Sequence, residues 1–143
     1  MRCVFCAIRD GHLPALSVAE NERAFAILDI NPISDGHTLI VPRAHVPTLF
    51  DIAEEDVVAT IRLAHRVASG IRRSLQPDGL NLLQNNGAAA FQSVPHFHMH
   101  LIPRWESDGK GFTWELVPGS PARMRVTADR IRDALRSGAA PAA

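Results

Sequence analysis

The pattern that most constrains this chain is an alternation of histidine and apolar residues over 96–102, His-Phe-His-Met-His-Leu-Ile. Successive side chains of a β-strand point to opposite faces, so the pattern predicts a strand with one apolar face in the core and one face of imidazoles. Three imidazoles on one face are costly unless each has a partner. A solvent-facing strand without chemistry is the alternative, and the turn-rich loop with amide and hydroxyl groups before it argues against that reading. The imidazole face holds His96, His98 and His100.

The spacing of these histidines limits what they can do together. Neighbours on one face lie about 6–7 Å apart and the outer pair about 13 Å apart. Two neighbours can share a metal ion, but three in line can hardly all reach one, because metal–nitrogen distances are about 2 Å. We therefore expect divided roles: one ring as a nucleophile, one binding an anion and one with a structural role. A pKa of about 6.5 suits attack on phosphorus by one ring and stabilisation of charge by another.

The remaining periodicities predict five strands and two helices around a single core. Strands are expected within 17–28 (a hairpin of two), and at 37–41, 79–84 and 97–102. A long helix is expected before Pro77-Asp78-Gly79, and a last helix over 127–136. This order predicts an α+β fold with a five-stranded, mostly antiparallel sheet. We expect one domain over 1–137 and a flexible tail over 138–143.

Two finer expectations concern the helices. In the long helix, residues recurring every three to four positions should face the core, and they are Val57, Ile61, Ala64, Val67 or Ala68, Ile71 and Leu75. In the last helix, Thr127 should be the N-cap, with Val126 and Ile131 as a hydrophobic staple.

Charge and composition exclude several classes of protein. Fifteen basic and fifteen acidic residues give a formal net charge of zero, which argues against a polybasic nucleic-acid binder. No apolar run approaches the roughly 18 residues of a membrane span, and the N-terminal apolar stretch is too short for a signal peptide. Two cysteines exclude a disulfide-dense scaffold. We expect a cytoplasmic protein that binds neither membranes nor nucleic acid.

The two cysteines are spaced as half of a four-ligand metal site, Cys3-x-x-Cys6. A redox pair of the thioredoxin type would need a preceding strand, and only two residues precede Cys3. A bare pair of free thiols is the other possibility. If a metal is bound, histidines would have to supply the remaining ligands.

At this point the sequence resembles the histidine triad family, whose signature is His-x-His-x-His followed by two apolar residues. The resemblance covers nearly the whole chain up to Arg104, whereas the rest matches only in general character. The matching segments are 3–6, 25–29, 36–45, 84–87, 92–94 and 96–102.

The resemblance implies a nucleotide hydrolase or transferase acting at the α-phosphate, with phosphoramidates or dinucleotides as substrates. His98 would be the nucleophile that forms a nucleotidyl-histidine, and His100 would contact the phosphate or the leaving group. Asp29 would accept hydrogen bonds from the ribose, although alone it could be a turn former. Ser93, Gln92 and Asn85 would hold phosphate oxygens or the leaving group. The base of a purine nucleotide would lie against four apolar side chains, those of Phe5, Ile8, Ile27 and Ile30.

The resemblance also implies a structural zinc ion and a homodimer. The zinc ligands would be Cys3, Cys6, His45 and His96, all present here. His37 would contact the triad histidines without touching the substrate. Two alternatives stay open: a zinc hydrolase that uses a metal-bound water, and a nucleotide-binding regulatory module with little turnover. The sequence specifies neither the base nor the leaving group.

Overall fold

The computed structural model describes residues 3–138. The chain divides after Lys110 into two compact units, which are described separately, so one domain over 1–137 stays a prediction. Of the predicted tail, residues 139–143 lie outside the described residues. Among residues 3–138, no helix combines the length and the apolar character that crossing a bilayer requires. The elements are α1 Val4–Arg9, β1 Ser17–Glu20, β2 Ala24–Leu28, β3 Thr38–Pro42, α2 Glu54–Leu75, β4 Gly79–Gln84, the 3-10 turn η1 Ala88–Ala90, β5 Met99–Arg104 and α3 Pro121–Arg136.

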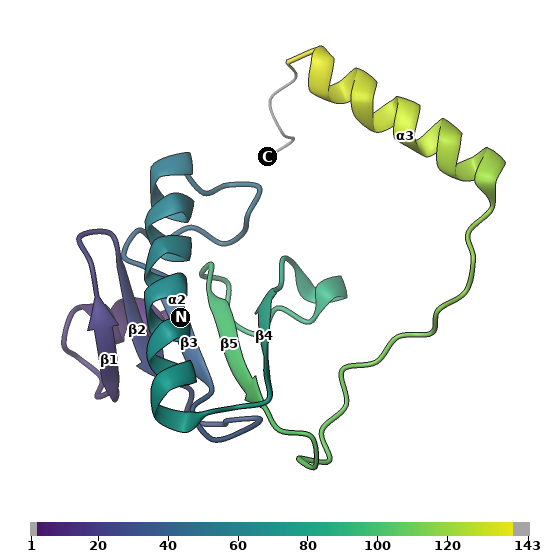
Figure 1. The fold of residues 1–143 in the computed structure, drawn as a ribbon. Coiled ribbons are helices and arrows are strands. Elements are labelled where there is room, and N and C mark those ends of the chain that lie inside the picture. The colour runs from purple at the N-terminus through teal and green to yellow at the C-terminus, as the bar shows by residue number, and fades with distance from the viewer. Residues whose placement is uncertain (1–2, 139–143) are drawn as a thin grey trace. The chain divides into compact units, whose positions relative to one another are not determined.

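The first unit is one five-stranded antiparallel sheet in the order β1-β2-β3-β5-β4 (Figure 1). It confirms the predicted α+β fold. After β3 the chain crosses one face of the sheet as α2 and returns at the far edge as β4, and β5 then fills the gap beside β3. Because β5 is paired on both sides, His100 lies inside the sheet, and His96 and His98 lie in the segment that leads into β5.

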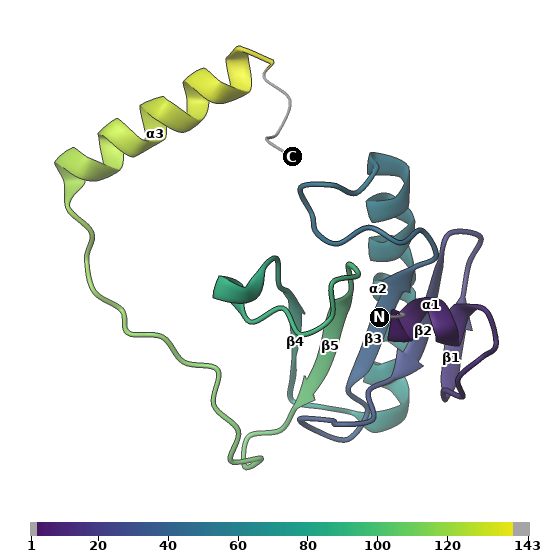
Figure 2. The same ribbon diagram turned by 180° about the vertical axis from the view of Figure 1, so that it is seen from behind.

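Both faces of β2 and β3 are covered, which explains why these strands are apolar at nearly every position. Figure 1 shows α2 across one face, and Figure 2 shows α1 against the other. The side chains under α2 form a core that includes Ala24, Ala26, Ile40, Leu63, Val67, Phe97, Met99 and Leu101. Those under α1 form a second cluster of Phe5, Phe25, Ile27, Leu39 and Val41.

The histidine strand is shifted by two residues from its predicted position of 97–102, to Met99–Arg104. At its start, the Phe97 N–H donates to the carbonyl of Val46 in a loop (2.7 Å) instead of pairing with a strand. At its end, Pro103 does not stop the strand. Since β3 pairs with β5 only as far as Leu101, the missing N–H of Pro103 costs no ladder hydrogen bond to β3.

The buried face of α2 also differs from its prediction. Ile61, expected in the core, is 39% exposed, whereas Thr60 and Leu63 are buried. Thr60 can be buried because its hydroxyl donates to the Asp56 carbonyl one turn earlier (2.7 Å). The remaining predicted face residues are buried or half-buried.

In the second unit, the prediction for the last helix was wrong at its start. Helix α3 begins at Pro121, and Ser120 is its N-cap, accepting the Arg123 N–H (3.5 Å). Thr127 therefore lies inside the helix. Serine followed by proline is a strong helix-start signal, because the serine oxygen accepts a free N–H and proline lacks the one that would be left over.

Candidate active site and metal cluster

His98 lies just before β5 and is 5% exposed. Its Nδ1 is 2.7 Å from the His96 carbonyl oxygen, which can only accept, so Nδ1 carries the proton. The lone pair of a neutral ring is then on Nε2. Burial lowers the pKa of His98, and this effect exceeds those of the His96 carbonyl and Asp29, which raise the pKa. His98 is therefore a neutral imidazole that presents an unprotonated Nε2.

The proton of His100 is placed by a chain of hydrogen bonds that begins in the backbone. The Ile33 N–H donates to His37 Nδ1 (3.0 Å), so the proton of His37 is on Nε2. That Nε2–H lies 2.9 Å from His100 Nδ1 and donates to it. The proton of a neutral His100 is consequently on Nε2, whereas the proton of His98 is on Nδ1.

Burial keeps these rings neutral. It lowers the pKa of His100 to about 4, with His98 and His37 adding repulsion of a positive charge, and it lowers the pKa of His37 against the carboxylate of Asp29. The ring centroids of His98 and His100 are 5.0 Å apart. Two adjacent rings thus offer one lone pair and one N–H donor.

Both rings border a cavity of about 460 Å³ between α1, the sheet and three loops. This volume suits a small organic ligand, and the walls are mostly apolar with few polar groups. Eight predicted site residues line it, and they are Phe5, Ile8, Ile27, Asp29, Ile30, Ser93, His98 and His100.

Asp29 follows β2 and is half-buried at the cavity. Its Oδ1 accepts the Asn31 N–H (2.8 Å), which is the turn-forming role. Its Oδ2 lies 3.5 Å from His37 Nε2. The carboxylate therefore closes the turn with one oxygen and keeps the other at the cavity.

Asn85 and Gln92 are not among the residues that line this cavity. The Gln92 amide nitrogen donates to the carbonyls of Pro47 (2.6 Å) and Val94 (3.0 Å), and its oxygen accepts the Gly87 N–H (2.7 Å). Gln92 thus joins two loops near the histidines. The phosphate roles of Asn85 and Gln92 stay predictions.

Several wall residues escaped the sequence analysis. They are Val4, Leu13, Pro14, Ala15, Leu28, Asn31, Leu39 and Val94. Helix α1 and the loop after it are too short for a periodic signal, so their position against the sheet could not be foreseen. Leu39 could have been found, because alternation along the strand places it on the same face as Val41.

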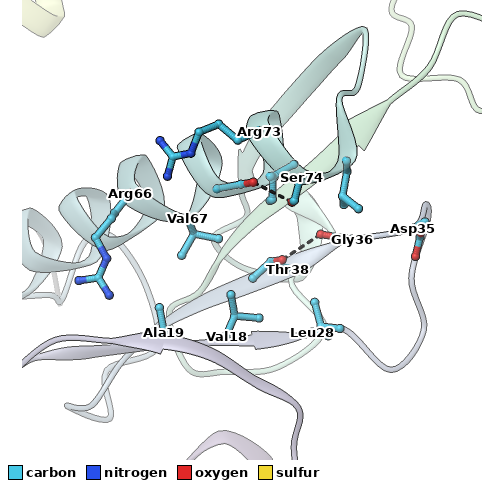
Figure 3. A pocket seen from close by; sticks show the side chains of 13 residues that line it. Val18, Ala19, Leu28, Asp35, Gly36, Thr38, Arg66, Val67, Arg73 and Ser74 are labelled. Carbon is cyan, nitrogen blue, oxygen red and sulfur yellow. Dashed lines mark hydrogen bonds between the residues drawn. The ribbon is translucent and has the colours of Figure 1, made fainter.

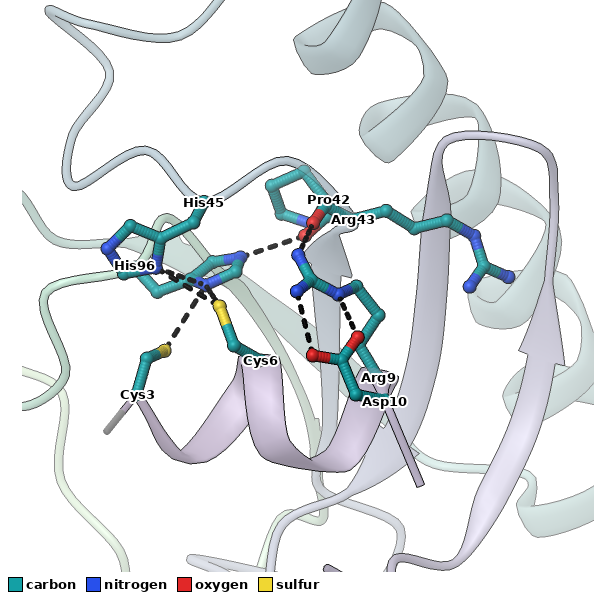
Figure 4. A network of polar contacts seen from close by, with 8 residues as sticks. All are labelled: Cys3, Cys6, Arg9, Asp10, Pro42, Arg43, His45 and His96. Atoms are coloured by element: carbon teal, nitrogen blue, oxygen red, sulfur yellow. Dashed lines mark hydrogen bonds and ion pairs between the residues drawn. The ribbon is translucent and has the colours of Figure 1, made fainter. Parts of the chain in front are cut away.

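Beside the cavity, four side chains converge in a cluster of Cys3, Cys6, His45 and His96 (Figure 4). The donor atoms lie within 4.8 Å of one another. His96 Nδ1 is 3.3 Å from Cys3 Sγ, 3.6 Å from Cys6 Sγ and 3.2 Å from His45 Nδ1. Tetrahedral zinc with sulfur at about 2.3 Å and nitrogen at about 2.0 Å separates its ligands by about 3.3–3.8 Å. The observed spacings fit such a site with little adjustment.

His96 is prepared for metal binding by its second nitrogen. Its Nε2 donates to the Pro42 carbonyl (2.8 Å), which leaves the lone pair on Nδ1, inside the cluster. Burial lowers the pKa of His96 to about 4, against that hydrogen bond, so the ring is neutral as a ligand must be.

Asp29, His37 and His100 also bring three donors within 4.8 Å of one another. The tautomers oppose a metal there, because the Ile33 N–H occupies the lone pair of His37 Nδ1 and the proton sits on Nε2. This group is therefore a hydrogen-bonded relay rather than a metal centre.

A second cavity of about 540 Å³ lies on the other face, between α2 and β1–β3 (Figure 3). Both hydroxyls of its lining are already used: Thr38 donates to the Gly36 carbonyl (2.8 Å) and Ser74 to that of Gly70 (2.7 Å). Its lining, as far as the structure describes it, contains neither imidazole nor thiol. We therefore place the chemistry in the histidine cavity.

The antiparallel sheet with these buried histidines beside an apolar cavity defines a protein of the histidine triad class. The HIT domain family matches residues 10–107, and the chain belongs to this family.

Three similar proteins connect the fold and the site to known members. Adenosine 5'-monophosphoramidase hnt1 of Schizosaccharomyces pombe is 33% identical over 137 residues, which cover 95% of this chain and 100% of that protein. The crystal structure of a HIT family member from Bacillus subtilis has a TM-score of 0.87 at 35% identity, covering 93% of this chain and 96% of that one. A zinc-bound histidine triad family protein from Mycobacterium smegmatis has a TM-score of 0.73 at 37% identity, covering 92% and 96%.

Proposed function

We propose that this protein is a cytoplasmic nucleotidyl hydrolase that cleaves a bond at the α-phosphate of a purine nucleotide conjugate, through a covalent intermediate on His98. The observation that carries the proposal is the pair of opposite tautomers, with a lone pair on His98 Nε2 and a proton on His100 Nε2. One ring is suited to attack and the other to donate. The relative from S. pombe acts, by its name, on an adenosine phosphoramidate, and this supports a nucleoside phosphoramidate as the substrate.

In the first half of the proposed reaction, His98 Nε2 forms a bond to the α-phosphorus while the bond from phosphorus to the leaving amine breaks. The amine takes the proton from His100 Nε2, and the negative charge left on the His100 ring is stabilised by the His37 Nε2–H at Nδ1 and by the cationic His98 ring beside it. The His98 ring becomes cationic, and the His96 carbonyl that accepts its Nδ1–H stabilises this charge.

In the second half, water attacks the phosphorus and the bond to His98 breaks. The water proton goes to His100 Nε2, which restores the starting state, and a nucleoside monophosphate is released. Because His37 occupies His100 Nδ1, the exchangeable proton of His100 is on the cavity side whenever the ring carries it.

Substrate binding follows from the cavity walls. The apolar side chains of Phe5, Ile8 and Ile27 would cover a purine base, with Ile30 at the rim. The Oδ2 of Asp29 would accept from the ribose hydroxyls, since a carboxylate can take two donors. The Ser93 hydroxyl and the His100 N–H would contact the phosphate oxygens.

We further propose that the cluster holds a structural zinc ion. Four protein ligands fill a tetrahedral shell and leave no position for water. This arrangement disfavours the alternative of a metal-bound water as the nucleophile. The zinc-bound relative from M. smegmatis supports the choice of metal.

The sheet edge at β4 favours a second copy of this chain as a partner. Leu80 and Leu82 on β4 are 37% and 51% exposed, and an unpaired apolar edge strand is prone to association. We propose a homodimer across this edge. Light scattering would give the mass of two chains, and of one chain after Leu82→Lys.

The function is tested by incubating an adenosine phosphoramidate with the wild type, His98→Ala and His65→Ala. His65 is an exposed ring on α2 and serves as the matched control. We expect release of AMP by the wild type and by His65→Ala, and a loss of at least about 10⁴-fold in His98→Ala. Binding of AMP without any turnover by the wild type would instead support the regulatory module, and turnover by His98→Ala would refute the covalent mechanism.

A further inference from the structure

The metal cluster contains both thiols of the chain, and a small oxidant can reach them. The sequence has two cysteines, both free and both half-buried. His45 beside them is exposed. The two sulfur atoms lie within 4.8 Å of each other, with Cys3 at the N-cap of α1 and Cys6 in its first turn. Modest movement of these side chains brings them to bonding distance.

One residue, His96, belongs to the metal cluster and to the active site at once. Its ring nitrogen Nδ1 faces Cys3 and Cys6, while its backbone carbonyl accepts the Nδ1–H of His98 (2.7 Å). The position of His96 therefore sets the tautomer and the direction of the proposed nucleophile.

Helix α1 provides a second link between the two sites. Its six residues include Cys6 and three residues that line the cavity, Val4, Phe5 and Ile8. The Phe5 ring lies edge-on to both His96 (centroids 5.7 Å apart) and His98 (5.0 Å apart). The metal cluster thus fixes the position of helix α1, whose side chains the base of the nucleotide would contact.

Resting on the proposed function, we propose that a peroxide oxidises Cys3 and Cys6 to a disulfide, and that this oxidation releases the metal and weakens nucleotide binding. One thiolate attacks the peroxide oxygen and becomes a sulfenic acid, and one hydroxide leaves. The other thiolate attacks that sulfur, forms the disulfide and expels a second hydroxide. Two thiolates lose two electrons, and the peroxide bond gains them.

The disulfide removes two of the four metal ligands, and the two histidines left hold zinc far more weakly. Of its two anchors, the metal and the Pro42 carbonyl, the His96 ring then keeps only the hydrogen bond from Nε2 to the carbonyl. The His98 tautomer and the Phe5 wall lose the support that the metal gave them. Reduction and added zinc reverse each step.

The test uses the reduced, zinc-loaded full chain titrated with hydrogen peroxide. Zinc release is followed with a chromogenic chelator, the disulfide by intact mass as a loss of two hydrogens, and AMP affinity by calorimetry. We expect one zinc released for each disulfide formed, and a fall in AMP affinity of about tenfold or more. Thiol reductant with zinc should restore the affinity. A gain of oxygen mass is mapped by peptide sequencing, which separates oxidised cysteine from oxidation of the exposed Met124; oxygen on Cys3 or Cys6 without a disulfide would overturn the oxidation step.

The matched variant is Cys3→His, which keeps a nitrogen ligand for zinc but cannot form the disulfide. Compared with its own untreated state, it should keep zinc and AMP affinity under peroxide, and circular dichroism checks its fold. A wild-type disulfide that leaves AMP affinity unchanged would overturn the coupling. Peroxide treatment that yields no disulfide would overturn the oxidation step. Failure of the reduced, zinc-loaded wild type to bind AMP would overturn the proposed function itself.

Discussion

The relay from His37 to His100 gives a prediction that can be worked from the structure. The change His37→Phe keeps a buried ring but removes both hydrogen bonds of His37, from the Ile33 N–H and to His100 Nδ1. Without the second bond, His100 is free to place its proton on Nδ1, where it cannot reach the leaving group. Loss of a hydrogen bond of 0.5–1.5 kcal/mol shifts the tautomer ratio by about 2- to 13-fold.

We therefore expect His37→Phe to lower kcat by about 2- to 13-fold, with KM nearly unchanged, because the relay acts on proton transfer rather than on the walls of the cavity. The free energy of unfolding should fall by about 1–3 kcal/mol, since the Ile33 N–H and His100 Nδ1 lose their partner. Steady-state kinetics and urea unfolding measure the two effects.

The matched comparison is His37→Gln, whose amide nitrogen can still donate to His100 Nδ1. It should retain more of kcat than His37→Phe at similar stability. Equal losses in both variants, or a kcat for His37→Phe within twofold of the wild type, would refute the proton relay and leave His37 with a packing role.

Three further predictions address binding and stability. Asp29→Asn should weaken the binding of AMP by about tenfold but leave the affinity for 2′,3′-dideoxy-AMP unchanged, because charge-assisted hydrogen bonds to the ribose hydroxyls are lost. Calorimetry measures both affinities, and equal losses for the two nucleotides would refute the ribose role. Gly36→Ala should lower the free energy of unfolding by about 2–4 kcal/mol in urea titrations, because Gly36 has φ +85° and a Cβ would clash with Leu75 Cδ1; an unchanged midpoint would contradict this. The free energy of unfolding should fall as pH drops from about 6.5 toward 4. In this window the unfolded chain binds a proton at His100 that the folded chain does not, because the folded state holds the pKa of His100 at about 4. The slope of this free energy against pH should be smaller in His100→Asn, and the same slope in that variant would exclude this cause.

The sheet was predictable because its strands are short apolar or alternating runs that are bounded by turn residues. Strand β4 has its predicted bounds, 79–84, since it follows Pro77-Asp78 directly. The start of β5 was not predictable, because the backbone of Phe97 pairs with a loop at Val46 that is distant in sequence. The side chains of residues 96–98 already alternate between the two faces, although the paired strand begins only at Met99. The predicted division into a core face and an imidazole face is therefore right, whereas the predicted strand bounds are not.

Other parts of the site depend on contacts that no local pattern contains. Helix α1 has six residues, too few for a periodicity, yet it supplies Phe5 and Ile8 to the cavity. The metal cluster joins positions 3, 6, 45 and 96, and only the family resemblance brought them together before the structure did. Gln92 has the amide chemistry expected of a phosphate ligand, but neighbouring backbone groups use its donors and its acceptor.

The central claim is that His98 becomes covalently attached to the nucleotide, and rapid-quench intact-mass spectrometry tests it most directly. Wild type mixed briefly with an adenosine phosphoramidate and quenched under mildly basic conditions should gain the mass of one adenylyl group, mapped by peptide sequencing to His98. His98→Ala should show no such adduct, and His65→Ala should match the wild type. AMP release by the wild type without any adduct, together with activity in His98→Ala, would contradict the account.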